Sequence, residues 1–186
     1  MQAVPLELTV SPPYNGRMER PSRNEYGEYF QRYVELVPDV DILTLLATQR
    51  DEFVSFLRSL GSAMGEHRYA PEKWSLKEVV GHIIDVERVF VYRALAFARG
   101  DATALPGFEQ DDYVAATDYS ARTLDDLAEE FSLHRSSSLA MFRSFDDDAW
   151  QRCGTASDTR ISARAVPYIL AGHVTHHMNV IRERYL

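Results

Sequence analysis

The chain has 186 residues, enough for one well-packed core but few for two full domains, so a single domain is expected. With 45% hydrophobic and 26% charged residues, its composition is that of a globular protein and not of a disordered or fibrous one. The formal net charge is −8 and no cluster of Lys and Arg stands out, which disfavours nucleic-acid binding. A single cysteine, Cys153, excludes an internal disulfide.

The N-terminal region is expected to form an extended arm. Residues 1–21 contain four prolines and few periodic apolar positions, so a helix is disfavoured there. A helical domain is expected over residues 22–186. We see neither a signal-peptide pattern nor an apolar run of the roughly 20 residues that span a membrane, which predicts a cytoplasmic protein without a membrane partner.

The first helices follow this arm. A short helical stretch is expected at about residues 24–36, before Pro38 breaks the chain. From Ile42 to Leu60, apolar side chains recur at three- and four-residue spacing. This pattern predicts a long amphipathic helix that ends at Gly61.

The second long helix has a clear beginning. Ser75 and Glu78 match the S-x-x-E capping box, in which each side chain binds a backbone N–H group near the helix start. The helix is expected to run to about Arg99 and to end at Gly100. Residues 101–122 are too irregular for a long helix and long enough to cover a site, so we interpret them as a lid-like connector.

Two further long helices complete the pattern. Thr123 can cap a third helix, whose core-facing stripe includes His134. After a connector that reaches Arg160, Ser162 can cap a last helix. Four long amphipathic helices, with no strand signal of comparable strength, predict an all-α protein built as a four-helix bundle, antiparallel or mixed.

Three histidines of the second and last helices are candidate metal ligands. His173 and His177 are four residues apart, so their rings project from one helix face on successive turns. His82 lies in the apolar face of the second helix and is the natural third ligand. Buried polar groups without partners cost about 1–3 kcal/mol each, and a shared cation would satisfy all three rings.

The spacing alone leaves an alternative, in which the three are ordinary core histidines bonded to backbone or hydroxyl groups. His134 is the main rival ligand, because it also lies on a core-facing stripe. His176 points about 100° away from His177 and is expected to be structural or to support the ligands. His67 is expected to be solvated in a loop. A glycine precedes two of the candidate ligands, in Gly81-His82 and in Gly172-His173. Glycine at these helical positions suggests that a neighbouring segment approaches the helix closely.

Two carboxylates of the second helix are candidate supports for the histidines. Asp85 and Glu87 are placed to accept a hydrogen bond from the second nitrogen of a metal-bound ring. Glu87 is also a weak candidate for a catalytic acid or base, although an ordinary buried ion pair with Arg93 or Arg164 is the favoured interpretation. Three tyrosines that can either line a pocket or pack in the core are Tyr92, Tyr113 and Tyr168.

Three segments carry a resemblance to a known family: WSLKEVVGHIIDVERVFVYRALAFARGD (Trp74 to Asp101), LPGFEQDDYV (Leu105 to Val114) and AGHVTHHMNVIRERYL (Ala171 to Leu186). Together they resemble the DinB/YfiT-like family of metalloenzymes, and the similarity runs from about residue 22 to the C-terminus. The resemblance implies a four-helix bundle with up-down-down-up connectivity, often dimeric. It also implies a divalent metal bound by three histidines, which fall on His82, His173 and His177.

The resemblance further implies a class of reaction. Some relatives are transferases or isomerases that use a low-molecular-weight thiol such as bacillithiol or mycothiol, so a metal-dependent thiol S-transferase with a small-molecule substrate is the leading hypothesis. A metal-assisted hydrolase is the second, and a non-catalytic stress or interaction bundle is the third. Zinc or nickel is the expected metal, although three imidazoles also accept iron, cobalt or copper.

Overall fold

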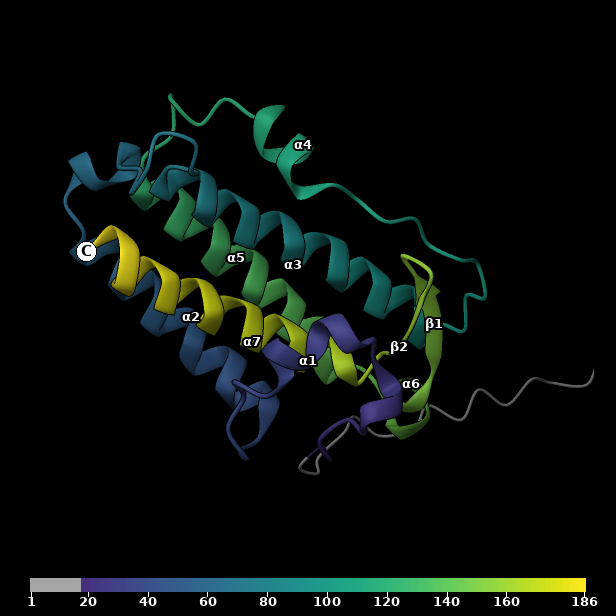
Figure 1. Ribbon diagram of the computed structural model, residues 1–186. Coiled ribbons are helices and arrows are strands. Elements are labelled where there is room, and N and C mark those ends of the chain that lie inside the picture. The colour runs from purple at the N-terminus through teal and green to yellow at the C-terminus, as the bar shows by residue number, and fades with distance from the viewer. Residues whose placement is uncertain (1–17) are drawn as a thin grey trace, which may run out of the picture.

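The structure is a computed structural model and is described over residues 18–186, so most of the expected N-terminal arm, residues 1–17, lies outside the description. Four long helices form a bundle (Figure 1). They are α2 (Ile42–Ser59), α3 (Leu76–Ala98), α5 (Leu124–Arg143) and α7 (Ala165–Val180). Helices α2 and α3 each pack against both α5 and α7. Helices α2 and α7 run in one direction and α3 and α5 in the other, which confirms the up-down-down-up bundle.

Local capping decides where the long helices begin. The Ser75 hydroxyl accepts a hydrogen bond from the Glu78 N–H, and the Glu78 carboxylate accepts one from the Ser75 N–H, as the capping box predicts. Thr123 caps α5 in the same reciprocal way with Asp126. Gly100 follows α3 with a φ of 77°, a left-handed conformation that favours glycine at helix ends. The three expected boundaries are therefore confirmed.

Shorter helical segments surround the bundle. The helical stretch expected at residues 24–36 is not one helix. It is divided into short helical segments of three or four residues each, all of which end before Pro38. The 3-10 segments are η1 (Arg23–Glu25), η2 (Glu28–Phe30) and η3 (Ser62–Glu66); the short α-helices are α1 (Gln31–Val34), α4 (Gln110–Ala115) and α6 (Asp147–Gln151). A π-helical segment, η4 (Ile181–Tyr185), continues α7. Within residues 18–186, no helix is long and apolar enough to cross a membrane.

A small hairpin stands where the sequence predicts only a connector. Strands β1 (Cys153–Ala156) and β2 (Thr159–Ser162) pair antiparallel. The turn residues Ser157 and Asp158 both have positive φ, 51° and 56°, which matches the tight two-residue turns of hairpins. After β2, the Ser162 hydroxyl accepts a hydrogen bond from the N–H of Ala165, the first residue of α7, but the N-cap residue of this helix is Arg164 and not Ser162 as expected.

The connector between α3 and α5 makes the parallel arrangement of these two helices possible. It leaves the end of α3, runs back along the outside of that helix, and includes α4 on the way (Figure 1). Part of it, Leu105, forms a bridge to Ala156 of β1 and so ties the connector to the hairpin. The connector therefore covers one side of α3 over much of its length.

Candidate metal centre

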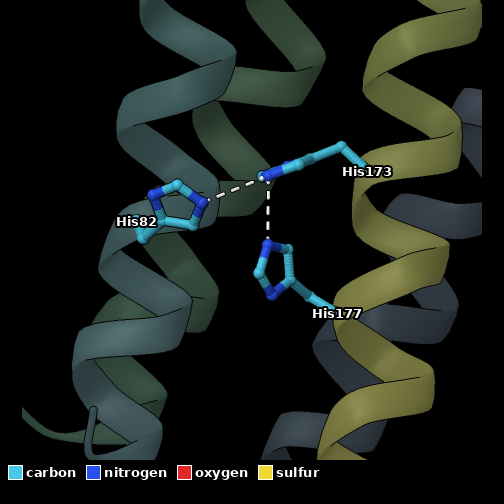
Figure 2. Close-up of side chains that lie close together, drawn as sticks. All are labelled: His82, His173 and His177. Atoms are coloured by element: carbon cyan, nitrogen blue, oxygen red, sulfur yellow. Dashed lines mark hydrogen bonds between the residues drawn. The ribbon is translucent and has the colours of Figure 1, made fainter. Parts of the chain in front are cut away.

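The structure brings the three candidate histidines together between α3 and α7. His82 projects from α3, and His173 and His177 project from α7 toward it (Figure 2). The Nε2 atom of His173 lies 3.2 Å from Nε2 of His82 and 3.1 Å from Nε2 of His177. One ligand nitrogen from each ring lies within 4.8 Å of the other two. His82 and His173 are buried, and His177 is half-buried.

Burial keeps these imidazoles neutral. Burial lowers the pKa of His82 to about 4 and, aided by repulsion from His82 and His176, that of His177 to about 3. The pKa of His173 is also lowered well below its usual value, by burial and then by its histidine neighbours. Neutral imidazole is the form that binds metals, since one ring nitrogen keeps a free lone pair.

The donor set fits a divalent metal ion. Nitrogen ligands lie about 2.0–2.1 Å from zinc, so two of them at a tetrahedral angle are about 3.3 Å apart. The observed separations of 3.1 and 3.2 Å are close to this value. Three converging Nε2 atoms cannot all be satisfied by hydrogen bonds among themselves, because each neutral ring has only one N–H group. A cation at their centre would satisfy all three.

The glycine before His173 permits a close contact that holds this part of α7. A Cβ atom on Gly172 would lie only 1.9 Å from the backbone oxygen of Tyr33, so α1 approaches α7 more closely than alanine allows. The Tyr33 ring then packs edge-on against the His173 ring, with centroids 5.3 Å apart. Close approach at Gly172 thus places an aromatic wall beside this ring.

The glycine before His82 has a comparable role. A Cβ atom on Gly81 would lie 2.2 Å from the hydroxyl oxygen of Tyr119, which belongs to the connector and not to a bundle helix. The indole of Trp74 packs against the His82 ring, with centroids 4.9 Å apart. The residue that precedes the cap of α3 therefore covers the His82 ring, while Tyr119 of the connector covers the neighbouring glycine.

The remaining histidines of the described chain lie outside the cluster. His134 is half-buried on α5, and its Nε2 atom is buried without a hydrogen-bond partner. The His176 ring packs edge-on against the Tyr33 ring, with 5.6 Å between the ring centroids. His67 is exposed at the end of η3, as predicted. The cluster thus contains three histidines and not four.

The expectation that Asp85 or Glu87 supports the histidines is wrong. The carboxylate of Asp85 forms an ion pair with Arg88, with 3.4 Å between Oδ1 of Asp85 and Nη1 of Arg88. Glu87 is fully buried and forms two 2.7 Å hydrogen bonds with Arg135 of α5, and the Ser138 hydroxyl donates a third. The ion-pair interpretation of Glu87 is therefore confirmed.

The partner of Glu87 differs from the two that the sequence suggests. Arg93 donates to the Pro106 carbonyl and Arg164 pairs with Glu25. The guanidinium that binds the Glu87 carboxylate belongs to Arg135 of the neighbouring helix α5. This bidentate pair occupies both oxygens of Glu87 and removes the residue as a candidate base.

The same ion pair connects to the helix that bears two of the histidines. Arg135 also donates to the side-chain oxygen of Gln49, 3.1 Å away. The Gln49 amide in turn donates to the Ala171 carbonyl at 2.8 Å and to the Thr175 hydroxyl at 3.0 Å. These acceptors flank His173 in sequence, so a buried polar network spanning four helices fixes the backbone around this ring.

A cavity of about 450 Å³ opens beside the histidines. Its lining includes His82 and His173, apolar side chains of α3, α7 and η2, residues 108–111 of the connector, and the hairpin turn. The connector thus lines a site, as its length suggests. None of the tyrosines named from the sequence lines this cavity: Tyr168 is buried in the core, and Tyr92 and Tyr113 are exposed. The lining tyrosines are Tyr29 and Tyr33.

Comparison with known proteins gives the family. The model of the DinB superfamily matches residues 45–181, more than half of the chain and all three clustered histidines. The chain belongs to the DinB superfamily. Among functionally curated proteins, none matches it in sequence.

A solved structure supports the fold of this DinB-superfamily chain. YfiT from Bacillus subtilis is similar over 89% of this chain and 93% of its own, with a TM-score of 0.62 and 13% sequence identity. YfiT is described as a probable metal-dependent hydrolase with an unusual four-helix bundle topology. At this identity the likeness shows a common fold and leaves the reaction of the present chain open.

Proposed function

We propose that this protein is a divalent-metal-dependent enzyme whose metal is held by His82, His173 and His177, and that it transfers a low-molecular-weight thiol to an electrophilic small molecule. One observation carries the proposal: three neutral imidazoles, two buried and one half-buried, converge beside a cavity that His82 and His173 line and that is large enough for a small ligand. Catalytic zinc sites have three protein ligands and leave a position for water or substrate, whereas structural sites are closed by four.

The chemistry of the reaction follows from this donor set. A divalent cation held by His82, His173 and His177 would lower the pKa of a thiol that binds to it, so that the thiol would ionise at neutral pH. The thiol sulfur forms a bond to an electrophilic carbon, the leaving group departs with its bonding electron pair, and the thiol proton passes to solvent. His82 and His173 both line the cavity, so a substrate held there is adjacent to the histidine cluster.

The ion pair of Glu87 supports a thiol over water as the nucleophile. A hydrolase benefits from a general base near the attacked bond. Glu87, the candidate base, is held by Arg135 in an ion pair between α3 and α5. Within residues 18–186, no carboxylate hydrogen-bonds to any of the three clustered rings. Thiol ionisation at a metal needs no such base.

A metal-assisted hydrolase is the second candidate. The description of YfiT as a probable metal-dependent hydrolase favours it, because the two proteins share the bundle topology. A zinc ion held by three imidazoles can lower the pKa of water to about 7. The non-catalytic alternative is less well supported, because His134 does not close the cluster with a fourth ligand.

Metal content is the first test of the proposal. Untagged wild type is expected to contain stoichiometric zinc or nickel, and His173→Ala to lose it. His134→Ala is the matched control, since it removes a half-buried histidine from the same bundle and should leave the metal in place. Wild type that is metal-free and does not take up added zinc or nickel would contradict metal binding.

Thiol titration then separates the two enzyme candidates. Cobalt or nickel bound in the site reports sulfur coordination by absorption, so titration with a small thiol is expected to produce a new band in wild type and none in His173→Ala. A metal-loaded protein without any thiol response, but with esterase or amidase activity, would favour the hydrolase.

A further inference from the structure

Arg93 is a buried cation without an acidic partner. Only 3% of this residue is exposed, and its Nη2 group donates to the Pro106 carbonyl at 2.9 Å and to the Ser157 hydroxyl at 3.1 Å. A guanidinium carries five N–H groups. In the described part of the chain, those on Nε and Nη1 have no hydrogen-bond partner, and no carboxylate forms an ion pair with Arg93. A buried charge is costly unless it is paired.

The guanidinium lines the same cavity as the histidines. His82 and Arg93 are eleven residues apart on α3, which is three helical turns plus about 20°, so the two share a helix face. Their Cα atoms are consequently about 16 Å apart along the helix axis. Val86 and Phe90 also line the cavity and lie between them on α3. The cavity is therefore elongated, with the histidines toward one end and Arg93 toward the other.

The wall between the two ends is largely apolar. Phe30 and Phe90 meet there with ring centroids 5.6 Å apart, and Ile169 and Phe108 also contribute to the lining. The Arg93 guanidinium lies over the rings of Phe90 and Phe108, 4.8 and 5.8 Å from their centroids. Aromatic faces attract such a cation but cannot neutralise its charge.

The hairpin turn adds a polar donor at the Arg93 end. Ser157 accepts a hydrogen bond from Arg93, which leaves its hydroxyl hydrogen available for another acceptor. Ser157 adopts a φ of 51°, an uncommon conformation for a residue other than glycine. The turn thus places this hydroxyl beside the unpaired guanidinium.

We propose that Arg93 and Ser157 form a subsite for the carboxylate of the substrate, and that the substrate is an elongated monocarboxylic acid with an apolar middle segment. The Nε and Nη1 groups of Arg93 and the Ser157 hydroxyl donate to the carboxylate. Val86, Phe90 and Ile169 contact the apolar segment. This inference deepens the proposed function and rests on it in one respect: the reacting end of the substrate is placed at the histidines.

The acidic residues of the cavity favour a monoanion. Glu109 and Asp111 also line it, but both are exposed near α4. They repel a dianion such as a phosphate monoester more strongly than a carboxylate, and one guanidinium balances a single negative charge. A carboxylate is therefore the better match than a phosphate.

The test is calorimetric titration of octanoate, 1-octanol and octyl phosphate into the full-length protein as purified, with metal content measured on each sample. We expect wild type to bind octanoate at least tenfold more tightly than 1-octanol and more tightly than octyl phosphate. Arg93→Met should weaken octanoate binding at least tenfold and leave 1-octanol binding unchanged. Arg99→Met is the matched control, since Arg99 is exposed at the end of the same helix and lies outside the cavity.

Three further variants separate this proposal from metal binding and from misfolding. His173→Ala should retain the preference for octanoate over 1-octanol even when metal is lost, so failure of the metal hypothesis leaves the subsite measurable. Arg93→Lys retains the charge and should bind octanoate more tightly than Arg93→Met, with thermal unfolding recorded for each variant. If Arg93→Met does not fold, Ser157→Ala should still weaken octanoate binding several-fold.

The proposal is overturned if wild type does not bind octanoate, or if Arg93→Met and Arg99→Met bind it equally well. Tighter binding of octyl phosphate than of octanoate would overturn the choice of a carboxylate. Loss of octanoate binding in His173→Ala, with binding retained in Arg93→Met, would place the carboxylate at the histidines instead.

Discussion

At the scale of single residues, the ion pair of Glu87 and Arg135 is structural, and this leads to a first prediction. Glu87→Gln leaves the fully buried guanidinium of Arg135 without an anion. Breaking a buried pair in this way typically costs about 3–5 kcal/mol. We expect a loss of this size in the free energy of unfolding, measured with urea. Folded Glu87→Gln at low temperature should take up as much added zinc or nickel as wild type does.

A surface carboxylate provides the control for this prediction. Glu130 pairs with Arg88 and Arg122, and these three side chains are 25%, 47% and 37% exposed. Exposed pairs contribute about 0–1 kcal/mol, so Glu130→Gln should have little effect on stability. Unchanged stability of Glu87→Gln together with lost activity would instead make Glu87 a catalytic residue.

At the scale of elements, the contact between α1 and α7 depends on Gly172, and this leads to a second prediction. In Gly172→Ala the new methyl group would overlap the backbone oxygen of Tyr33, which cannot move without shifting α1. Overpacking of this kind costs about 1–3 kcal/mol. We therefore expect a lower thermal unfolding temperature and weaker metal binding, because the Tyr33 ring leaves its position against His173.

Gly81→Ala separates steric overlap from the general effect of replacing a helical glycine. Its methyl group would meet the end of the Tyr119 side chain, which can rotate away, whereas alanine favours the helix by about 1 kcal/mol. Gly81→Ala should therefore be less destabilising than Gly172→Ala. The reverse order in thermal unfolding would contradict the idea that backbone contact at Gly172 matters more.

The elements also show how much the sequence could predict and why. Helix beginnings were predictable because a capping box such as Ser75 with Glu78 is contained in four consecutive residues. The hairpin was missed because its strands have four residues each and its Ser157-Asp158 turn lacks the usual glycine. The hairpin also pairs with a segment that is distant in sequence, since Leu105 of the connector forms a bridge to Ala156 of β1.

The candidate site shows the same division between local and distant information. The spacing of His173 and His177, and the glycine before His82, were visible in the sequence. The role of Arg135 as the partner of Glu87 was not visible in the sequence, because it depends on which side of α5 faces the interior. The expected stripe includes His134, but Arg135 is the more deeply buried of these neighbours, and it provides the partner of Glu87.

At the scale of the whole molecule, Glu25 fastens the N-terminal segment to the hairpin and α7, and this leads to a third prediction. Its carboxylate accepts hydrogen bonds from the Ser162 hydroxyl at 2.8 Å and from Nε of Arg164 at 3.0 Å. Burial raises the pKa of Glu25, but the hydrogen bonds from Arg164, Ser22 and Ser162 outweigh it and lower the pKa to about 2.

The sign of the pH dependence follows from this pKa. Because the folded value lies below the ordinary value of 4.5, the stabilisation is fully present above about pH 4.5 and is lost as pH falls toward 2. Glu25→Gln should therefore be less stable than wild type at pH 7, and the difference in unfolding free energy should shrink between pH 4.5 and pH 3. A difference that stays constant over this interval would contradict the role of the charge.

The histidine cluster joins α3 to α7, so metal binding should stabilise the whole bundle. A ligand that binds only the folded state adds RT ln(1 + [L]/Kd), or about 2.7 kcal/mol at a free concentration of one hundred times Kd. We expect added zinc or nickel to raise the thermal unfolding temperature of metal-free wild type, and to raise that of His134→Ala equally. His82→Ala should lose the effect, because only the α7 pair then remains.

The comparison of His82→Ala with His177→Ala tests whether the coupling between helices is responsible. Each variant leaves two histidines, but only His177→Ala retains one on α3 and one on α7. If stabilisation comes from the link between the two helices, His177→Ala should keep more of the metal-dependent rise in unfolding temperature than His82→Ala. Equal loss in both would mean that the number of ligands determines the effect. A full rise in His82→Ala would place the metal away from α3 and contradict the three-histidine site.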